Sequence, residues 1–579
     1  MPRFVFSSLV ICAAVATGGA CAKARPSVTT ATPAAMVASR PGSDPQPAEQ
    51  VVAAAGSPVA RLRQELEQAF DNPSVNALWA VEIQSFETGE VFYQRNEHML
   101  VMPASNMKLV TMAMAADRLG WDFRFTTEVK TRGAIADGVL KGDLIVSGNG
   151  DPTMSDRDKA NRYQAFEGWA DRLKAAGISR VEGRIIGDDN LFDDQPLGEG
   201  WMWDDLTGSS APPGGALQFN ENLVRVVITP AATAGQPATV RFDPDGSGLT
   251  LRANVMTVAP PTPPAATASP ATPVTPDPSL PRALRLSRAL GSSVLEVNGV
   301  ILAGAPETSR LTPVLNPTIY YVNSLRDTLI RKGIEVTGTA VDIDDVTDQA
   351  QAAAPLRTLI AHQSPPLTEI GTTFMKVSQN TFGETLMTTI GARSGRTEKF
   401  LAAAAGPTAG PTSGAATIAT PPTLITPPQH YQIEAAREVY EEVLSSWGIP
   451  ETQHVIADGS GLSRYNFLTA DMLVKILRQM ARDPRHAAAY EATLPIAGKD
   501  GTLERRMKGT RAENNVHAKT GTISNVRSLS GYVRTRDNEL IGFSVIANNF
   551  KARAATIDAV AELAVERLAN FTREASKPR

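Results

Sequence analysis

The sequence contains almost no cysteine. Only two of its 579 residues are cysteines, Cys12 and Cys21, and both lie in the N-terminal segment. A mature chain without that segment holds no thiol, which excludes thiol catalysis, zinc–thiolate sites and disulfide bonds. The six histidines are scattered, and none forms the i, i+4 pair around a glutamate that zinc proteases use. We therefore predict no metal site, and nothing in the sequence implies an organic cofactor.

An excess of positive charge is also missing. The chain has 56 lysines and arginines against 60 acidic residues, which gives a formal net charge of -4. Proteins bind nucleic acids largely through basic surfaces that release counterions, so no nucleic-acid partner is predicted. The length is too great for one hydrophobic core and indicates about three or four domains.

The N-terminus has the features of an export signal. A positively charged start precedes the apolar stretch 4–17, which is too short to span a bilayer, and small residues follow it. We predict a signal peptide at residues 1–22 and export to the periplasm or cell envelope. The alternative is a lipid anchor on Cys21, although Gly18 stands where bacterial lipoproteins usually carry a large aliphatic residue.

Three segments are poor in large apolar residues and rich in Ala, Pro, Ser and Thr. Residues 23–56 are predicted to be a disordered linker, because they cannot bury enough surface to fold. Residues 260–281 and 402–428 are predicted to be disordered loops inside folded sequence.

Hydrophobic periodicity predicts elements at both ends of the folded sequence. They are a helix over 59–70, a hairpin over 78–93, adjacent antiparallel strands at 526–533 and 540–547, and an amphipathic helix over 557–571.

Ser105 and Lys108 stand at the head of the nearly all-apolar run 107–119, which predicts a buried helix. Positions three apart share a helix face, so the lysine amine can reach the serine hydroxyl. A lysine acts as a base for a serine nucleophile when burial and nearby positive charge lower its pKa. The alternative interpretation is a serine that caps the helix and a lysine that extends its amine to solvent.

A second motif is Ser378-Gln379-Asn380. An acyl-transfer site needs a nucleophile, a proton path, an oxyanion hole and a group that binds the substrate. Ser378 would relay a proton to the leaving amine, and Asn380 would hold Lys108 or the substrate amide. The pattern alone is weak, because Ser74 begins another Ser-x-Asn that we interpret as a turn.

A third motif, Lys519-Thr520-Gly521, is followed by Thr522. The charge of Lys519 would help to keep the first lysine neutral. Gly521 would let the substrate backbone approach the strand closely, and the two threonine hydroxyls would bind an anionic substrate carboxylate. The backbone N–H groups of Ser105 and Thr522 would form the oxyanion hole.

The ordered trio resembles the motifs of penicillin-binding proteins and β-lactamases. The spacing is more specific, since Ser105 and Ser378 lie 273 positions apart. In this wide spacing the chain is similar to the class C low-molecular-mass penicillin-binding proteins, the D-alanyl-D-alanine carboxypeptidase/endopeptidases. These proteins carry extra domains between the first and second motifs. Four further segments resemble this family: 142–152, 200–205, 362–367 and 458–464.

The resemblance implies an α/β (α+β) fold with a penicillin-binding, β-lactamase-like serine transpeptidase domain. We expect a five-stranded antiparallel sheet flanked by helices, built from 57–122 and 356–579. Residues 123–355 would form an insert of one or two nested β-rich domains.

The resemblance also implies a serine-type D-Ala-D-Ala carboxypeptidase/DD-endopeptidase. Ser105 would attack the bond between two D-alanines of a peptidoglycan stem peptide or a cross-link, and water would hydrolyse the acyl-enzyme. β-Lactam antibiotics would inhibit the enzyme by acylating Ser105. Peripheral or lipid-anchored membrane association and the oligomeric state stay open.

Two rival functions are weighed against this one. A β-lactamase or esterase of the same fold needs a base for a fast deacylating water, and no such base is evident between the motifs. A wall-binding scaffold with vestigial catalysis is disfavoured by the intact trio.

The sequence departs from the family pattern at two positions. Gln379 replaces a frequent aspartate, and its side chain is expected to point away from the nucleophile. Gly383 replaces the usual alanine and is expected to loosen its helix slightly.

Overall fold

The computed structural model describes residues 56–157, 161–260, 283–347, 355–404 and 431–574. The predicted signal peptide, linker and both low-complexity tracts lie outside these ranges except at their edges. One edge differs from the prediction, because the tract expected to begin at residue 402 overlaps the end of helix α7, Thr397–Ala404. Within the described residues, no helix is long and apolar enough to cross a membrane.

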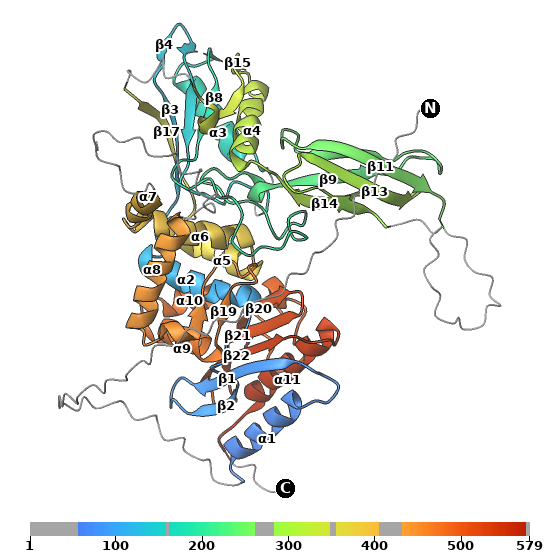
Figure 1. Cartoon of the computed structure of the whole chain (residues 1–579), viewed down its shortest axis with the longest axis vertical. Coiled ribbons are helices and arrows are strands. Elements are labelled where there is room, and N and C mark those ends of the chain that lie inside the picture. The colour runs from blue at the N-terminus through green and yellow to red at the C-terminus, as the bar shows by residue number, and fades with distance from the viewer. Residues whose placement is uncertain (1–55, 158–160, 261–282, 348–354, 405–430, 575–579) are drawn as a thin grey trace, which may run out of the picture. The chain divides into compact units, whose positions relative to one another are not determined.

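The sheet that carries the third motif has five strands, β1 Leu78–Ser85, β2 Val91–Arg95, β20 His517–Ile523, β21 Val526–Arg534 and β22 Leu540–Asn548. Their order is β2-β1-β22-β21-β20, and every neighbouring pair is antiparallel. Strands from the two ends of the sequence meet here, because β1 pairs along its whole length with β22 (Figure 1). The predicted five-stranded antiparallel sheet is confirmed.

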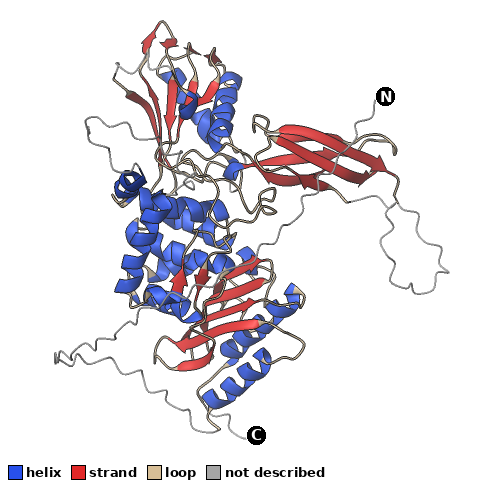
Figure 2. Cartoon of the chain, in the orientation of Figure 1, coloured by secondary structure: helices blue, strands red, loops and turns tan. Residues whose placement is uncertain are grey.

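Two helices cover one face of this sheet, α1 Pro58–Phe70 and α11 Ala554–Asn570 (Figure 2). Their buried residues recur at helical spacing: Leu62, Leu66, Phe70, Ile557 and Leu568. They share a hydrophobic core with sheet residues such as Val81 and Phe543. Both amphipathic helices therefore follow from the sequence pattern.

The other face packs on a helical layer: α2 Met107–Arg118, α5 Leu367–Lys376, α6 Asn380–Arg393, α8 Tyr431–Ser446, α9 Ala470–Arg482 and α10 Ala487–Thr493. Ala80 faces this core and its neighbour Val81 faces the other, as strand alternation requires. Helix α2 is buried on all sides from Met107 to Ala116, in agreement with its all-apolar sequence. The short pair β18 His454–Val455 and β19 Phe467–Leu468 and two 3-10 turns, η4 Glu451–Gln453 and η5 Gly501–Leu503, complete this part.

The first part of the insert holds two sheets and two helices. The bounds are β3 Thr126–Thr131, β4 Ala134–Ala136, β5 Val139–Lys141, β6 Leu144–Ser147, α3 Gln164–Ala175, β7 Arg180–Val181, β8 Ile185–Asp188, α4 Pro317–Arg331, β15 Glu335–Val336, β16 Ala340–Asp342, η3 Ile343–Asp345 and β17 Arg357–Gln363. The sheet orders are β16-β8-β6-β3-β17 and β15-β7-β5-β4. One aromatic-rich core, with Phe166, Trp169 and Tyr321, joins the helices to the strands.

Two three-stranded sheets make up the nested second part of the insert. The bounds are η2 Asn220–Asn222, β9 Leu223–Thr229, β10 Thr239–Asp243, β11 Thr250–Val258, β12 Arg285–Ser287, β13 Val294–Leu302 and β14 Thr308–Pro313. The sheet orders are β10-β9-β14 and β11-β13-β12, and both sheets share one small apolar core.

Strand β17 bears on where the insert ends. The sequence placed the return to the catalytic part at residue 356, but β17 pairs with β3 from Arg357 to Gln363. A strand that pairs in the insert sheet belongs to the insert. We therefore propose that the return lies at Ser364, whose N–H donates to the Phe125 carbonyl.

Gly383 lies where helix α6 comes into close contact with the loop 458–463. A Cβ at this position would lie 2.8 Å from the carbonyl oxygen of Gly459, and a Cβ on Gly459 would lie 2.3 Å from the carbonyl oxygen of Gly383. The glycine pair lets α6 and the loop at 458–463 touch backbone to backbone. The expectation of a loosened helix thus missed why the glycine is there.

Gly383→Ala should therefore destabilise the protein although alanine favours helix. Overpacking against a backbone carbonyl costs about 1–3 kcal/mol. The control is Gly168→Ala in α3, where a Cβ would meet nothing within 4 Å and alanine should gain up to about 1 kcal/mol. Thermal unfolding should show a lower midpoint for the first variant and an equal or higher one for the second. Equal midpoints in both would contradict the close contact.

Candidate active site

Ser105 lies in the 3-10 turn η1, Ala104–Asn106, directly before α2. The sheet holds this turn through side chains of β21. Ser528 Oγ donates to the Pro103 carbonyl at 2.8 Å, and Asn106 Nδ2 donates to Ser530 Oγ at 2.6 Å. These contacts fix the serine at the joint between sheet and helix.

Gly521 explains how β20 approaches this turn. A Cβ at Gly521 would lie 3.0 Å from the Ser105 nitrogen and 2.8 Å from the Pro103 oxygen. Ser528 Oγ of β21 lies nearer still, so the serine turn and the Ser528 side chain together fill the space beside Gly521. The sequence had assigned that space to the substrate backbone.

The Lys108 amine lies at the centre of the site. Its Nζ is 2.9 Å from Ser105 Oγ, and it donates to Asn380 Oδ1 and to the Ser460 carbonyl at 2.6 Å each. The residue is 0% exposed, so the interpretation of a lysine that extends to solvent is wrong. A neutral amine has two N–H donors, which the two carbonyl oxygens accept, and its lone pair then faces the Ser105 hydroxyl.

Burial lowers the pKa of Lys108 to about 7, against the opposing pull of the Asp458 and Glu384 carboxyls. A large fraction of the amine is therefore neutral at physiological pH and able to accept a proton. This matches the pKa that a general base requires.

Ser378 pairs with the second lysine. Lys519 Nζ donates to Ser378 Oγ at 2.8 Å and to the Thr520 carbonyl at 2.7 Å. Burial, and then the charge of Lys108, lowers the pKa of the fully buried Lys519 well below its usual value. The site therefore favours one protonated amine over two.

The two threonines of the third motif differ in their surroundings. The Thr520 hydroxyl lies 2.8 Å from that of Thr502 in η5, and its residue is buried. Thr522 is exposed on β20. Of the two hydroxyls, that of Thr522 is the more accessible to a substrate.

The loop 458–463 is rich in glycine, and its sequence favours a turn that Asp458 stabilises over an Asp458 that lines the cleft. Its Asp458 accepts the N–H groups of Gly461 and Ser463 at 2.7 Å each, and Asn466 Nδ2 at 2.6 Å. The turn interpretation is correct for Asp458. What it missed is that the same loop presents the Ser460 carbonyl to Lys108.

Glu384 in α6 supports that loop from behind. Its carboxyl accepts the Ser460 N–H at 2.9 Å and the Gly459 N–H at 3.3 Å. Burial, with a contribution from the Asp458 charge, raises the pKa of Glu384 to about 8. No local sequence signal marks this residue, because its role depends on a loop 75 or 76 positions away.

The insert reaches the same site. Trp201 Nε1 donates to Asp458 Oδ2 at 2.9 Å, and Asn380 Nδ2 donates to the Ser210 carbonyl at 2.7 Å. The sequence favours Trp201 and Trp203 as core anchors of the insert over platforms for glycans, but Trp203 is 70% exposed and is therefore not a core residue. The insert thus contacts residues that surround Lys108.

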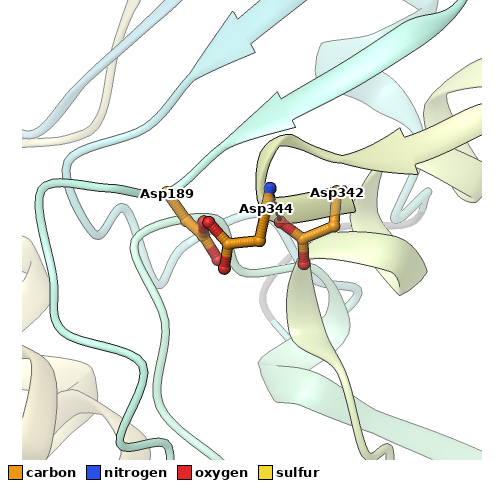
Figure 3. Close-up of side chains that lie close together, drawn as sticks. All are labelled: Asp189, Asp342 and Asp344. Atoms are coloured by element: carbon orange, nitrogen blue, oxygen red, sulfur yellow. Dashed lines mark hydrogen bonds between the residues drawn. The ribbon is translucent and has the colours of Figure 1, made fainter. Parts of the chain in front are cut away.

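Three carboxylates of the insert are close enough to share a cation. Asp189, Asp342 and Asp344 each place an oxygen within 4.8 Å of the others (Figure 3). Asp189 and Asp342 also accept hydrogen bonds from Thr318 Oγ1 and Asn316 Nδ2. Acidic groups of this kind are common without a metal, and no step of the chemistry below uses them.

A five-stranded antiparallel sheet flanked by helices, with a serine–lysine pair facing a second such pair, defines a serine enzyme of the penicillin-binding type. The chain belongs to the D-Ala-D-Ala carboxypeptidase 3 (S13) family, whose model matches residues 62–408 and 428–568. It is accordingly a serine-type D-Ala-D-Ala carboxypeptidase, an enzyme of peptidoglycan, and the resemblance stated from its motifs is confirmed.

Its relatives agree with this assignment. A D-alanyl-D-alanine carboxypeptidase of an Actinomadura species is 31% identical over 522 residues, 88% of this chain and 85% of that protein. The D-alanyl-D-alanine carboxypeptidase DacB of Haemophilus influenzae is 24% identical, over 81% of this chain and 84% of that protein. The crystal structure of penicillin binding protein 4 from Haemophilus influenzae shares the fold, with a TM-score of 0.66 at 21% identity, over 89% of this chain and 99% of that one.

The rate of Ser105 acylation should depend on pH through Lys108. If the neutral Lys108 amine is the general base, the rate should rise with pH up to about 7, where most of the amine has lost its proton. Below that value the neutral fraction falls about tenfold per pH unit. Stopped-flow labelling with a fluorescent penicillin measures this profile, with circular dichroism at each pH as the control for folding. A flat profile from pH 5 to pH 9 would rule out Lys108 as the titrating base.

Proposed function

We propose that Ser105 is the nucleophile and Lys108 its general base. The observation that carries this is the buried Lys108 amine, 2.9 Å from Ser105 Oγ, with its other near partners both carbonyl oxygens. Ser105 Oγ attacks the carbonyl carbon between two D-alanines while its proton passes to Lys108. The backbone N–H groups of Ser105 and Thr522 receive the developing oxyanion.

Ser378 then serves the leaving group. Its hydroxyl gives a proton to the departing D-alanine amine and regains one from Lys519, which lies 2.8 Å away. Asn380 keeps the Lys108 amine in place through its side-chain carbonyl. Water then attacks the acyl carbonyl carbon, and its hydroxyl completes the carboxyl group of the shortened stem peptide. Ser105 Oγ takes back a proton from Lys108 as the acyl bond breaks, and the proton lost by the water returns through solvent to Lys519.

The substrate side of the proposal rests on the third motif. The edge strand β20 contains Thr520, Gly521 and Thr522 and runs beside Ser105. The exposed Thr522 hydroxyl and the Lys519 charge suit the carboxylate of a terminal D-alanine, which favours carboxypeptidase action. Cleavage of cross-links by the same serine is the endopeptidase activity, and β-lactams mimic the same acyl donor.

Glu384 does not supply the base that a β-lactamase would need for its deacylating water. Glu384 is the buried carboxyl of α6 beside Lys108, and both its oxygens accept N–H groups of the loop 458–463. It therefore faces that loop and is not free to activate water at the acyl bond. Acylation by penicillin should be long-lived.

Substituting the motif residues tests the mechanism. Ser105→Ala should abolish labelling by a fluorescent penicillin and release of D-alanine from a stem pentapeptide. Ser378→Ala should slow both by about 10²–10⁴-fold, because it interrupts proton transfer. Ser74→Ala, in another Ser-x-Asn sequence on an exposed turn, is the matched control and should change neither.

Two results would contradict the proposal. Labelling of Ser105→Ala would show that another residue is acylated. Efficient labelling of the parent chain with no release of D-alanine would separate penicillin binding from carboxypeptidase activity.

We further propose that the chain is exported and works at the cell wall, where its substrate lies. Residues 1–22 would be removed as a signal peptide, or Cys21 would become a lipid-modified N-terminus that holds the enzyme at a membrane surface. The intact mass of the mature protein separates these outcomes, because a diacylglycerol group adds a mass that cleavage alone does not.

A further inference from the structure

A buried left-handed turn of the insert lies against the second motif. The three residues of η2, Asn220, Glu221 and Asn222, have φ angles of 52°, 57° and 55°. Left-handed backbone costs roughly 1–2 kcal/mol for each residue other than glycine. Each of the three residues is at most 6% exposed, so the surrounding structure must hold them in this conformation.

Two asparagine side chains supply that support. Asn222 Nδ2 donates to the Pro213 carbonyl at 2.8 Å, and Asn220 Nδ2 donates to the Leu223 carbonyl at 2.8 Å. Backbone strain that is held this firmly often serves a functional site. What the turn achieves is the placement of one side chain, that of Glu221.

The Glu221 carboxylate joins the insert to the second motif. Arg157 binds both of its oxygens, with Nη2 at 2.6 Å from Oε2. Gln379 Nε2 also donates to Oε2. Glu221 and Gln379 are both more than nine-tenths buried, so this is a desolvated contact between a charge and an amide.

Gln379 transmits the contact to the residues on either side. Its side-chain oxygen accepts the Thr381 N–H at 3.4 Å and so caps α6, while its amide faces Glu221. The preceding residue, Ser378, has a φ of 62°, another left-handed conformation. The following residue, Asn380, holds Lys108.

We propose that Glu221 is a positioning residue for acylation, which acts through Gln379 on Ser378 and Asn380. The proposal rests on the roles given above to those two residues. It also gives a reason for Gln379, since an aspartate or glutamate there would face the buried Glu221 carboxylate. Arg157 can balance one of two such charges, whereas an amide needs no balance.

Exchange of the two groups tests this. Gln379→Glu sets carboxylate against carboxylate, and Glu221→Gln removes the acceptor charge, so each should slow the limiting acylation rate by about tenfold to hundredfold. The double variant, Glu221→Gln with Gln379→Glu, restores one carboxylate and one amide beside Arg157. It should regain most of the lost rate, because the two effects are coupled.

Stopped-flow labelling at saturating fluorescent penicillin, on the full mature chain, gives the limiting rate, and thermal unfolding gives the midpoint. Glu335→Gln is the matched control, an exposed insert carboxylate that pairs with Arg180, and it should leave the rate unchanged. If a charged variant does not fold, Gln379→Asn replaces it. The shorter asparagine side chain is also neutral and can still cap α6, but it does not extend as far toward Glu221. This variant should therefore also slow acylation.

Three outcomes separate the hypotheses. Parental rates in the single variants, with Ser378→Ala slow, would overturn the positioning role and leave the proposed mechanism standing. A double variant that regains the midpoint but not the rate would reduce Glu221 to a stabilising contact. A Ser378→Ala variant with the parental rate would overturn the proposed mechanism itself.

Discussion

The burial of the Lys108 amine is the constraint on which the site depends. A buried ammonium is costly, so the amine needs polar partners and a lowered pKa, and the fold supplies both. Asn380 comes from α6, Ser460 from the loop 458–463, and Ser105 from the turn before α2. Three segments far apart in sequence must therefore meet around one nitrogen, and small backbones such as Gly383 and Gly459 make that meeting sterically feasible.

The insert belongs to the same arrangement. Hydrogen bonds run from its Trp201 to the loop that carries Ser460, from Asn380 to its Ser210 carbonyl, and from Gln379 to its Glu221. Residues from both parts of the chain therefore surround the two serine–lysine pairs.

Much of the fold was predictable because its signals are local. The apolar run of α2, the stripes of α1 and α11 and the ordered motifs predicted the sheet and the family, which are confirmed. The roles of Gly383, Gly521 and Ser460 were not predictable from the sequence. They depend on close contacts between backbone segments that lie far apart in the chain. The boundary that we propose at Ser364 also depends on a non-local contact, the pairing of β17 with β3.

Direct titration of the Lys108 amine tests the central claim most directly. Carbon-13 labelling of lysine ε-carbons allows the amine to be followed by NMR, and the signal that Lys108→Met removes identifies it. We predict that this signal titrates with a pKa of about 7. A Lys108 pKa above about 10 would contradict the account, since the amine would then be protonated when Ser105 must lose its proton.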